Sequence, residues 1–231
     1  MGVHPKESRG RPQTSSVFIA LWLLHKRPIL EKQPTPAATL HNYIIIMKEV
    51  HIMQCGDYTY RAIDTGAEIM EYYGQGGEIT LPETLDSLPV VSVGLCAFIM
   101  RTDLTAVTLP KTLRHIGGSA FEGCSALTSI TLNDGLETIE YRAFASCTAL
   151  REIAFPDSVT AVGGAVLSGC TALNSVHLPN ALTVLPMQAL MNCTSLEFLN
   201  LPDTLTRIDH EALRGCTHLT ALAIPASVRE I

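Results

Sequence analysis

The chain has 231 residues, of which 47% are hydrophobic and 16% are charged, and its formal net charge is −6 at pH 7. This hydrophobic content excludes intrinsic disorder as the main state, and the negative charge argues against a nucleic-acid partner, which would need a basic surface. No apolar run approaches the roughly 18 residues that a membrane span needs, so we expect no membrane span.

Residues 1–50 differ from the rest of the chain in charge and in pattern. They carry seven Lys/Arg and three Asp/Glu residues, whereas residues 51–103 carry two and eight. We interpret residues 1–50 as a non-repeat extension that is either disordered or not translated, because Met47 and Met53 are alternative starts to Met1. The apolar segment 17–24 is short for a signal peptide, and basic residues follow it where small residues should lead to a cleavage site. The compartment of the protein therefore stays open.

Residues 104–231 are built from a repeat of 23 residues. Two columns of this repeat are the cysteines Cys124, Cys147, Cys170, Cys193 and Cys216 and the leucines Leu104, Leu127, Leu150, Leu173, Leu196 and Leu219. Each unit follows the pattern L-x-x-I-x-L-P-x-x-L-x-x-I-G-x-x-A-F-x-G-C. The alternation in L-x-x-I-x-L predicts a short strand that the proline ends. The A-F-x-G-C segment predicts a tight turn or a single helical turn. One unit cannot bury its own apolar side, but stacked units form a continuous core.

These columns resemble the BspA-type leucine-rich repeat family, with five full units and a partial sixth over residues 104–231. The resemblance implies a leucine-rich-repeat solenoid that is mostly β, with short turns or single helical turns and a parallel sheet on the concave face. It also implies a non-catalytic binding scaffold for protein–protein or cell-surface recognition, similar to an adhesin. Its partner would be a protein or a surface ligand, and the protein would be secreted or at a surface.

The resemblance extends upstream into residues 51–103. Ile79 to Pro82 is similar to a repeat strand with its proline, and Ala97-Phe98 aligns with Ala120-Phe121 at the repeat offset. Five extra residues lie between Pro82 and Val93. Residues 58–74 look like the lead-in of such arrays, a hairpin that caps the first rung. We therefore divide the chain into 1–50, 51–103 (capping hairpin and irregular first repeat) and 104–231. Arg101 stands where later units have cysteine.

The last unit stops at Ile231, thirteen residues in. An open end would expose apolar rungs and a sheet edge. Either the sequence is a fragment, or a partner or second copy covers this end.

The cysteine column is interpreted as buried packing, with disulfides or a metal ladder as the alternatives. No C-x-x-C pair and no Cys/His spacing typical of zinc is present. Cys55 and Cys96 lie off the column and are the expected reactive thiols. No nucleophile motif, acid pair or dinucleotide fingerprint occurs, so we expect no enzymatic activity, cofactor or metal.

Binding then falls to the exposed positions beside the central apolar residue of each strand. Most of these positions hold small neutral residues. The exceptions form a candidate ligand-binding patch of Glu152, His177, Phe198 and Asn200. An aromatic residue among polar groups is a common anchor of a recognition surface. Two other functions stay open: an intracellular scaffold with the same architecture, and a repeat spacer of a larger protein whose functional domain is missing.

Overall fold

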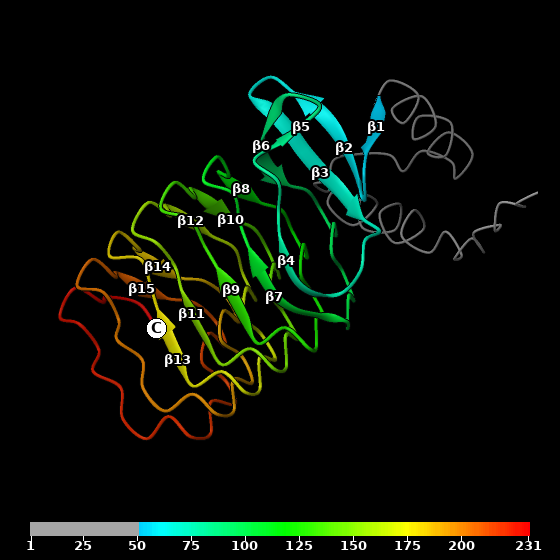
Figure 1. The fold of residues 1–231 in the computed structure, drawn as a ribbon. Helices are drawn as coiled ribbons and strands as arrows, with labels where there is room; N and C mark the ends of the chain where they lie inside the picture. Colours follow the sequence, from blue (N-terminus) through cyan, green and yellow to red (C-terminus); the bar gives the residue numbers. More distant parts are fainter. Residues whose placement is uncertain (1–50) are drawn as a thin grey trace, which may run out of the picture. The chain divides into compact units, whose positions relative to one another are not determined.

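The computed structural model, which describes residues 51–231, is a β-solenoid with parallel ladders of short strands and no helix among these residues (Figure 1). From residue 104 on, neighbouring strands are in register at an offset of 23 residues, as in the pair Val107 and Ile130. The predicted repeat solenoid with a parallel sheet is thereby confirmed. The A-F-x-G-C segments form turns and not helical turns.

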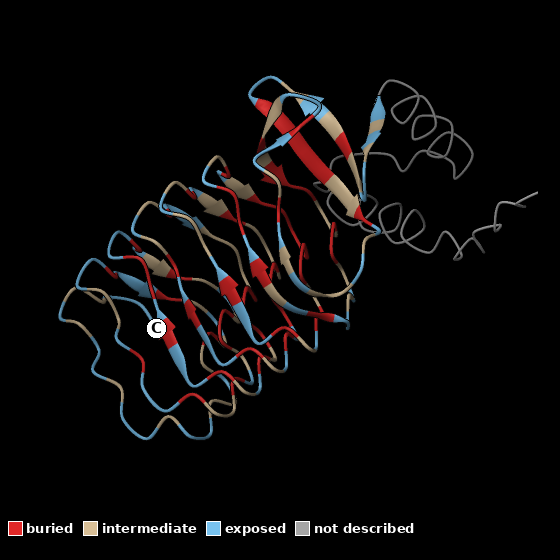
Figure 2. Ribbon diagram, in the orientation of Figure 1, coloured by how far each residue is buried: buried red, intermediate tan, exposed pale blue. Residues whose placement is uncertain are grey.

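Residues 196–201 and 219–224 form no strand although the L-x-x-I-x-L pattern predicts one there, but the earlier units do form the predicted strands of a first ladder. They are β4 (Gly77–Thr80), β7 (Leu104–Thr108), β9 (Ser129–Thr131), β11 (Glu152–Ala154) and β13 (Ser175–His177). β4, β7 and β9 form one parallel sheet, and β11 pairs with β13 in another. Ile130, Ile153 and Val176 are buried at the strand centres, and the residues on either side of each are exposed (Figure 2). This follows from the alternation of side chains along a strand.

A second ladder lies at the I-G position of each repeat, where the repeat pattern does not predict a strand. Its members are β6 (Leu88–Val93), β8 (His115–Ile116), β10 (Thr138–Ile139), β12 (Ala161–Val162), β14 (Val184–Leu185) and β15 (Arg207–Ile208). β6, β8, β10 and β12 pair in parallel within one larger mixed sheet, and β14 pairs in parallel with β15. Strands of two residues are too short to show alternation, so the pattern revealed only their buried apolar column.

The interior is a stack of equivalent side chains from successive rungs. The clearest example is an aromatic stack in which the ring centroids of Tyr72 and Phe98, Phe98 and Phe121, and Phe121 and Phe144 are 5.4, 4.9 and 5.6 Å apart. Buried Leu167 and Leu190 continue this column. The buried side chains of each rung therefore pack against those of the next rung, as the repeat pattern predicts.

The turn of each repeat places two residues in the left-handed region. The first position is Cys96, Ser119, Arg142, Ala165, Gln188 or Glu211, and the second is Met100, Gly123, Ser146, Gly169, Asn192 or Gly215. Backbone hydrogen bonds join successive turns, such as Phe121 N to Ala143 O at 2.8 Å and Leu167 N to Ala189 O at 2.9 Å. The glycine of the repeat pattern occupies the second of these positions, where it avoids a steric cost.

Residues 51–103 begin with three antiparallel strands. They are β1 (Ile52–Cys55), β2 (Tyr58–Ile63) and β3 (Gly66–Tyr72), paired in chain order. β3 then pairs in parallel with β6, so the β2–β3 hairpin lies beside the first strand of the second ladder. β5 (Thr84–Leu85) and β6 form a small hairpin, with Asp86 and Ser87 at positive φ, and this hairpin lies within the irregular first repeat. The divisions at residues 50 and 103 stay predictions, and residues 1–50 lie outside the described part.

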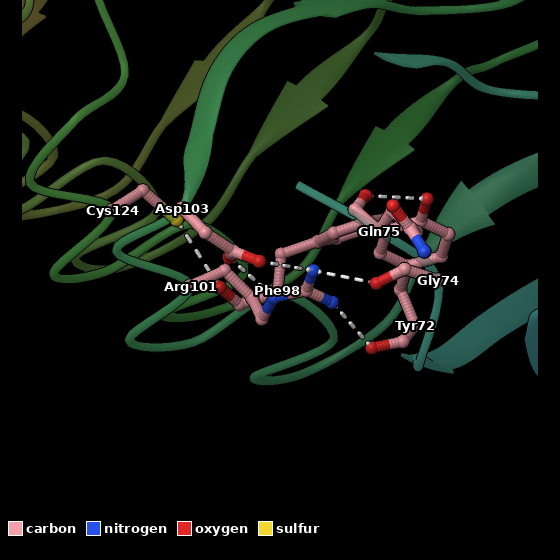
Figure 3. Close-up of polar contacts among 7 residues, drawn as sticks. All are labelled: Tyr72, Gly74, Gln75, Phe98, Arg101, Asp103 and Cys124. Carbon is pink, nitrogen blue, oxygen red and sulfur yellow. Dashed lines mark hydrogen bonds and ion pairs between the residues drawn. The ribbon is translucent and has the colours of Figure 1, made fainter. Parts of the chain in front are cut away.

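Arg101 connects the hairpin to the first rung (Figure 3). Its guanidinium donates hydrogen bonds to the carbonyl oxygens of Tyr72 at 2.9 Å and Gly74 at 2.8 Å, and it pairs with Asp103 at 2.8 Å. The guanidinium also lies 4.9 Å from the centroid of the Tyr72 ring. In later rungs a cysteine thiol occupies this column, as Cys124 does with its hydrogen bond to the Phe98 carbonyl. The departure at Arg101 thus has a structural role, because a longer donor reaches the hairpin.

Candidate binding surface

The outward positions of the first ladder form a face that is mostly small and uncharged. Thr80, Thr108 and Thr131 are in register on β4, β7 and β9, and all three are exposed. Ser129 and Ala154 are exposed on the same ladder. These side chains are short, so a large side chain on this face projects beyond its neighbours.

The four predicted patch residues are all exposed on consecutive rungs. Glu152 is the first residue of β11, and His177 is the last residue of β13, whose register pairs Glu152 with Ser175 and Ala154 with His177. Phe198 and Asn200 lie on either side of buried Leu199 in the next rung. Their part in binding stays a prediction.

The rung of Phe198 stacks directly on the rung of β13. The Thr204 hydroxyl donates to the carbonyl oxygens of Asn180 at 2.6 Å and Leu182 at 2.9 Å, which lie in the preceding rung. The Thr194 hydroxyl donates to the Thr171 carbonyl at 3.3 Å in the same manner. With roughly 4.8 Å between rungs, Phe198 lies about two rungs from Glu152 in one column.

Phe198 is the most exposed aromatic side chain of the described residues, with an exposed fraction of 75%. Leu199 is buried and the residues before and after it are exposed, the same pattern as in β13, although residues 196–201 form no strand. We define the Phe198 face as the exposed residues of segments 151–157, 174–180 and 197–203. Within this face, Phe198 is the large apolar side chain that has no core role.

The Phe198 face has an acidic surround that the sequence analysis did not identify. Its acidic residues are Glu152, Asp157, Glu197 and Asp203, and its basic residues are Arg151 and, when protonated, His177. The Asp157 carboxylate accepts hydrogen bonds from the backbone N of Asn180 at 2.9 Å and its Nδ2 at 3.0 Å, which lower the pKa of that carboxyl. Asp157 and Asp203 stand 46 residues apart, so the repeat period itself was the signal.

The cysteine column packs in the interior as free thiols. Cys124, Cys147, Cys170 and Cys193 are buried, and Cys216 is half-buried. Each Sγ donates to a carbonyl oxygen 26 residues earlier, at 3.1–3.2 Å. Burial raises the pKa of Cys124 and of Cys170 to about 12. The column has therefore no disulfide, and its thiols stay protonated at neutral pH.

Cys96 is a poorer candidate for a reactive thiol than its sequence position predicts. Burial, with a smaller effect from Glu122, raises the pKa of Cys96 to about 11. Because the thiolate is the nucleophile, this shift opposes reactivity, but it is smaller than the shifts of Cys124 and Cys170, and the reactivity of Cys96 relative to the column stays a prediction. Cys55 is half-buried, and its reactivity stays a prediction.

Within residues 51–231, no three His, Cys, Asp or Glu side chains gather in a way that could hold a metal ion. The same part of the chain contains no helix of the length and apolarity that crossing a bilayer requires.

Comparison with known proteins places these features in a family. Residues 91–220 and 183–231 match the model of the BspA type leucine rich repeat region, with six copies. The T. pallidum leucine rich repeat protein is 31% identical, with a TM-score of 0.64 over 73% of this chain and 91% of that one. A leucine rich cell surface protein of Faecalibacterium prausnitzii is 26% identical, with a TM-score of 0.57 over 74% of this chain and 53% of that one. No curated protein matches the chain.

Similarity to a further structure is limited to the fold. The pneumococcal vaccine antigen PcpA is 21% identical, with a TM-score of 0.55 over 71% of this chain and 47% of that one. The chain thus spans about half the length of the Faecalibacterium protein and of PcpA.

Proposed function

Because the chain belongs to the BspA-type leucine-rich repeat family, we propose that it is a non-catalytic binding scaffold that recognises a protein or a cell surface. In this mechanism the rigid solenoid displays the Phe198 face, and no covalent bond is made or broken. Rigidity matters because a preformed surface loses little conformational entropy on binding.

The observation that carries this proposal is the exposure of Phe198, at 75%. Leaving a phenylalanine in water sacrifices roughly 1.5–3 kcal/mol of burial that folding could have gained. Nothing in the packing of the rung requires this residue, since Leu199 already fills the core position. An aromatic anchor surrounded by polar groups is typical of the centre of a binding interface.

A role at a cell surface is supported by one relative. The Faecalibacterium protein is described as a cell surface protein, and this chain shares 26% of its residues in the aligned region. As part of the proposal, we place this chain at a cell surface, where it has an adhesin-like role.

The direct test is binding of the fluorescently labelled protein to cultured epithelial cells, measured by flow cytometry over a concentration series. We expect saturable binding that Phe198→Ser weakens at least about tenfold, as for a central anchor. The matched control is Met100→Ser, because Met100 is also an exposed apolar residue, at 67%, but lies in a turn of the solenoid.

Melting temperatures of both variants equal to that of the unsubstituted protein would show that neither change disturbs the fold. Binding that does not saturate, or that Met100→Ser weakens as much as Phe198→Ser, would contradict the proposal.

A further inference from the structure

We propose that the occupant of the Phe198 face is a basic protein segment that carries an aromatic side chain. This inference rests on the proposed function and adds the chemical class of the partner. It is drawn from the shape around Phe198, from the charge of the face and from the chemistry of an exposed ring.

The shape around Phe198 leaves its ring open on both sides. The repeat offset places Ser175 and Ala221 in the column of Phe198, one rung before and one rung after it. Both are small, and both are exposed. An incoming flat side chain can therefore lie against the Phe198 ring from either neighbouring rung, in the offset or edge-to-face arrangements that aromatic pairs prefer.

The charge of the face selects the sign of the partner. Glu152 lies in the rung before β13, in the column of Ser175 and Phe198, and Glu197 directly precedes Phe198 in the rung after β13. Asp157 and Asp203 lie at the far end of the same two rungs. Arg151 is the one Arg or Lys residue of the Phe198 face. The hydrogen bonds from Asn180 keep the Asp157 carboxyl ionised. An acidic partner would meet like charges here, whereas a basic one is attracted.

The exposed ring adds a specific preference for cations. A guanidinium or ammonium group over the face of an aromatic ring is attracted by the ring quadrupole. In this chain Arg101 already makes such a contact with Tyr72, at 4.9 Å from the ring centroid. Phe198 has small neighbours on both sides in its column, and Glu152 lies two rungs before it in the same column, so a basic segment can place one cationic group on the ring and another beside the carboxylate.

The test uses the full chain, labelled with ¹⁵N, and two capped peptide probes: Lys-Arg-Trp-Arg-Lys and Glu-Asp-Trp-Asp-Glu. Titration followed by amide chemical shifts reports both affinity and location. We expect the basic probe to shift the amides of segments 151–157, 174–180 and 197–203. Phe198→Ser should abolish these shifts, and 0.5 M salt should weaken binding, because exposed charge pairs are screened.

Carboxylate variants isolate the contribution of charge. Glu152→Gln and Glu197→Gln should each raise the dissociation constant of the basic probe about twofold to fivefold, as expected for exposed charge pairs. The matched control is Glu137→Gln, since Glu137 is an exposed carboxylate that pairs with Arg114 outside the Phe198 face. Its substitution should leave the affinity unchanged.

The two possible failures are distinguishable. If the acidic probe binds the same amides as tightly as the basic one, the inferred partner chemistry is wrong, and the proposed use of the face stands. If neither probe shifts these amides, both the inferred chemistry and the proposed binding face are overturned.

Discussion

The two left-handed positions in each turn of the solenoid are filled by different residues. The second position is glycine in Gly123, Gly169 and Gly215, but Ser146 occupies it in one rung with φ of 59°. A residue with a side chain pays roughly 1–2 kcal/mol in this conformation, and glycine does not. Ser146 therefore retains a local strain that the three glycine rungs avoid, and Met100 and Asn192 retain it at the same position of other rungs.

Ser146→Gly should consequently stabilise the fold. We expect an increase of about 1 kcal/mol in the free energy of unfolding, because the relief of strain exceeds the entropy that glycine loses. Urea unfolding followed by circular dichroism measures it. The reciprocal control, Gly169→Ser, replaces a glycine with φ of 77° and should destabilise the protein by a similar amount. A loss of stability in Ser146→Gly would refute the strain argument.

The thiol column makes stability depend on alkaline pH. Burial raises the pKa of Cys170 from 9.0 to about 12, so between these values the unfolded chain loses a proton that the folded chain keeps. Deprotonation then favours the unfolded state, so the free energy of unfolding should fall as pH rises above about 9. Below about pH 9 this thiol gives the free energy of unfolding no dependence on pH.

The measurement is the urea midpoint at several values between pH 8 and pH 11. Cys170→Ala should make the decline shallower. Leu173→Ala, a buried change in the same rung, is the control: it should lower the midpoint and leave the slope with pH unchanged. Parallel slopes for Cys170→Ala and the unsubstituted protein would count against the buried-thiol explanation.

The strands of this molecule are too short to be stable alone, so their stability depends on the contacts between neighbouring elements. The β2–β3 hairpin reaches the first rung through the pairing of β3 with β6 and through Arg101. The Arg101 side chain is only 17% exposed, so its hydrogen bonds to the Tyr72 and Gly74 carbonyls are largely shielded from water. Charged donors to backbone oxygens in such a place stabilise more than surface ion pairs do.

Arg101→Met should therefore cost about 2–3 kcal/mol and loosen the hairpin first. Hydrogen exchange of amides in residues 58–72 measures the local effect, and urea unfolding measures the global one. Arg207→Met is the matched control, because Arg207 also pairs with an aspartate two residues later, Asp209, at 2.7 Å but is 47% exposed. It should cost less than about 1 kcal/mol. Equal effects of the two substitutions would rule out a special role for Arg101.

At the scale of the whole molecule, stability comes from contacts between neighbouring rungs. Ile153 is 3% exposed, and its strand residues pair in register with those of β13. In such an array a defect weakens its own rung and the interfaces on both sides of it. A buried charge is the most severe defect of this kind, because nothing in the core can solvate or pair it.

Ile153→Asp should destabilise the protein by more than about 4 kcal/mol and remove exchange protection from the rungs of Ile130 and Val176. Ala154→Asp introduces the same charge at the adjacent exposed position, so it should cost less than about 1 kcal/mol. Thermal unfolding and hydrogen exchange compare the two. Similar melting temperatures would contradict the inward orientation of Ile153.

The repeat period by itself determined the solenoid, the buried columns and the exposure of Phe198, because a fixed offset of 23 residues with one alternating segment admits one way to stack. The tertiary structure decided two features that the repeat period does not predict. The two-residue strands of the second ladder exist only through their neighbours, and Arg101 acquires its role from the carbonyls of a distant hairpin.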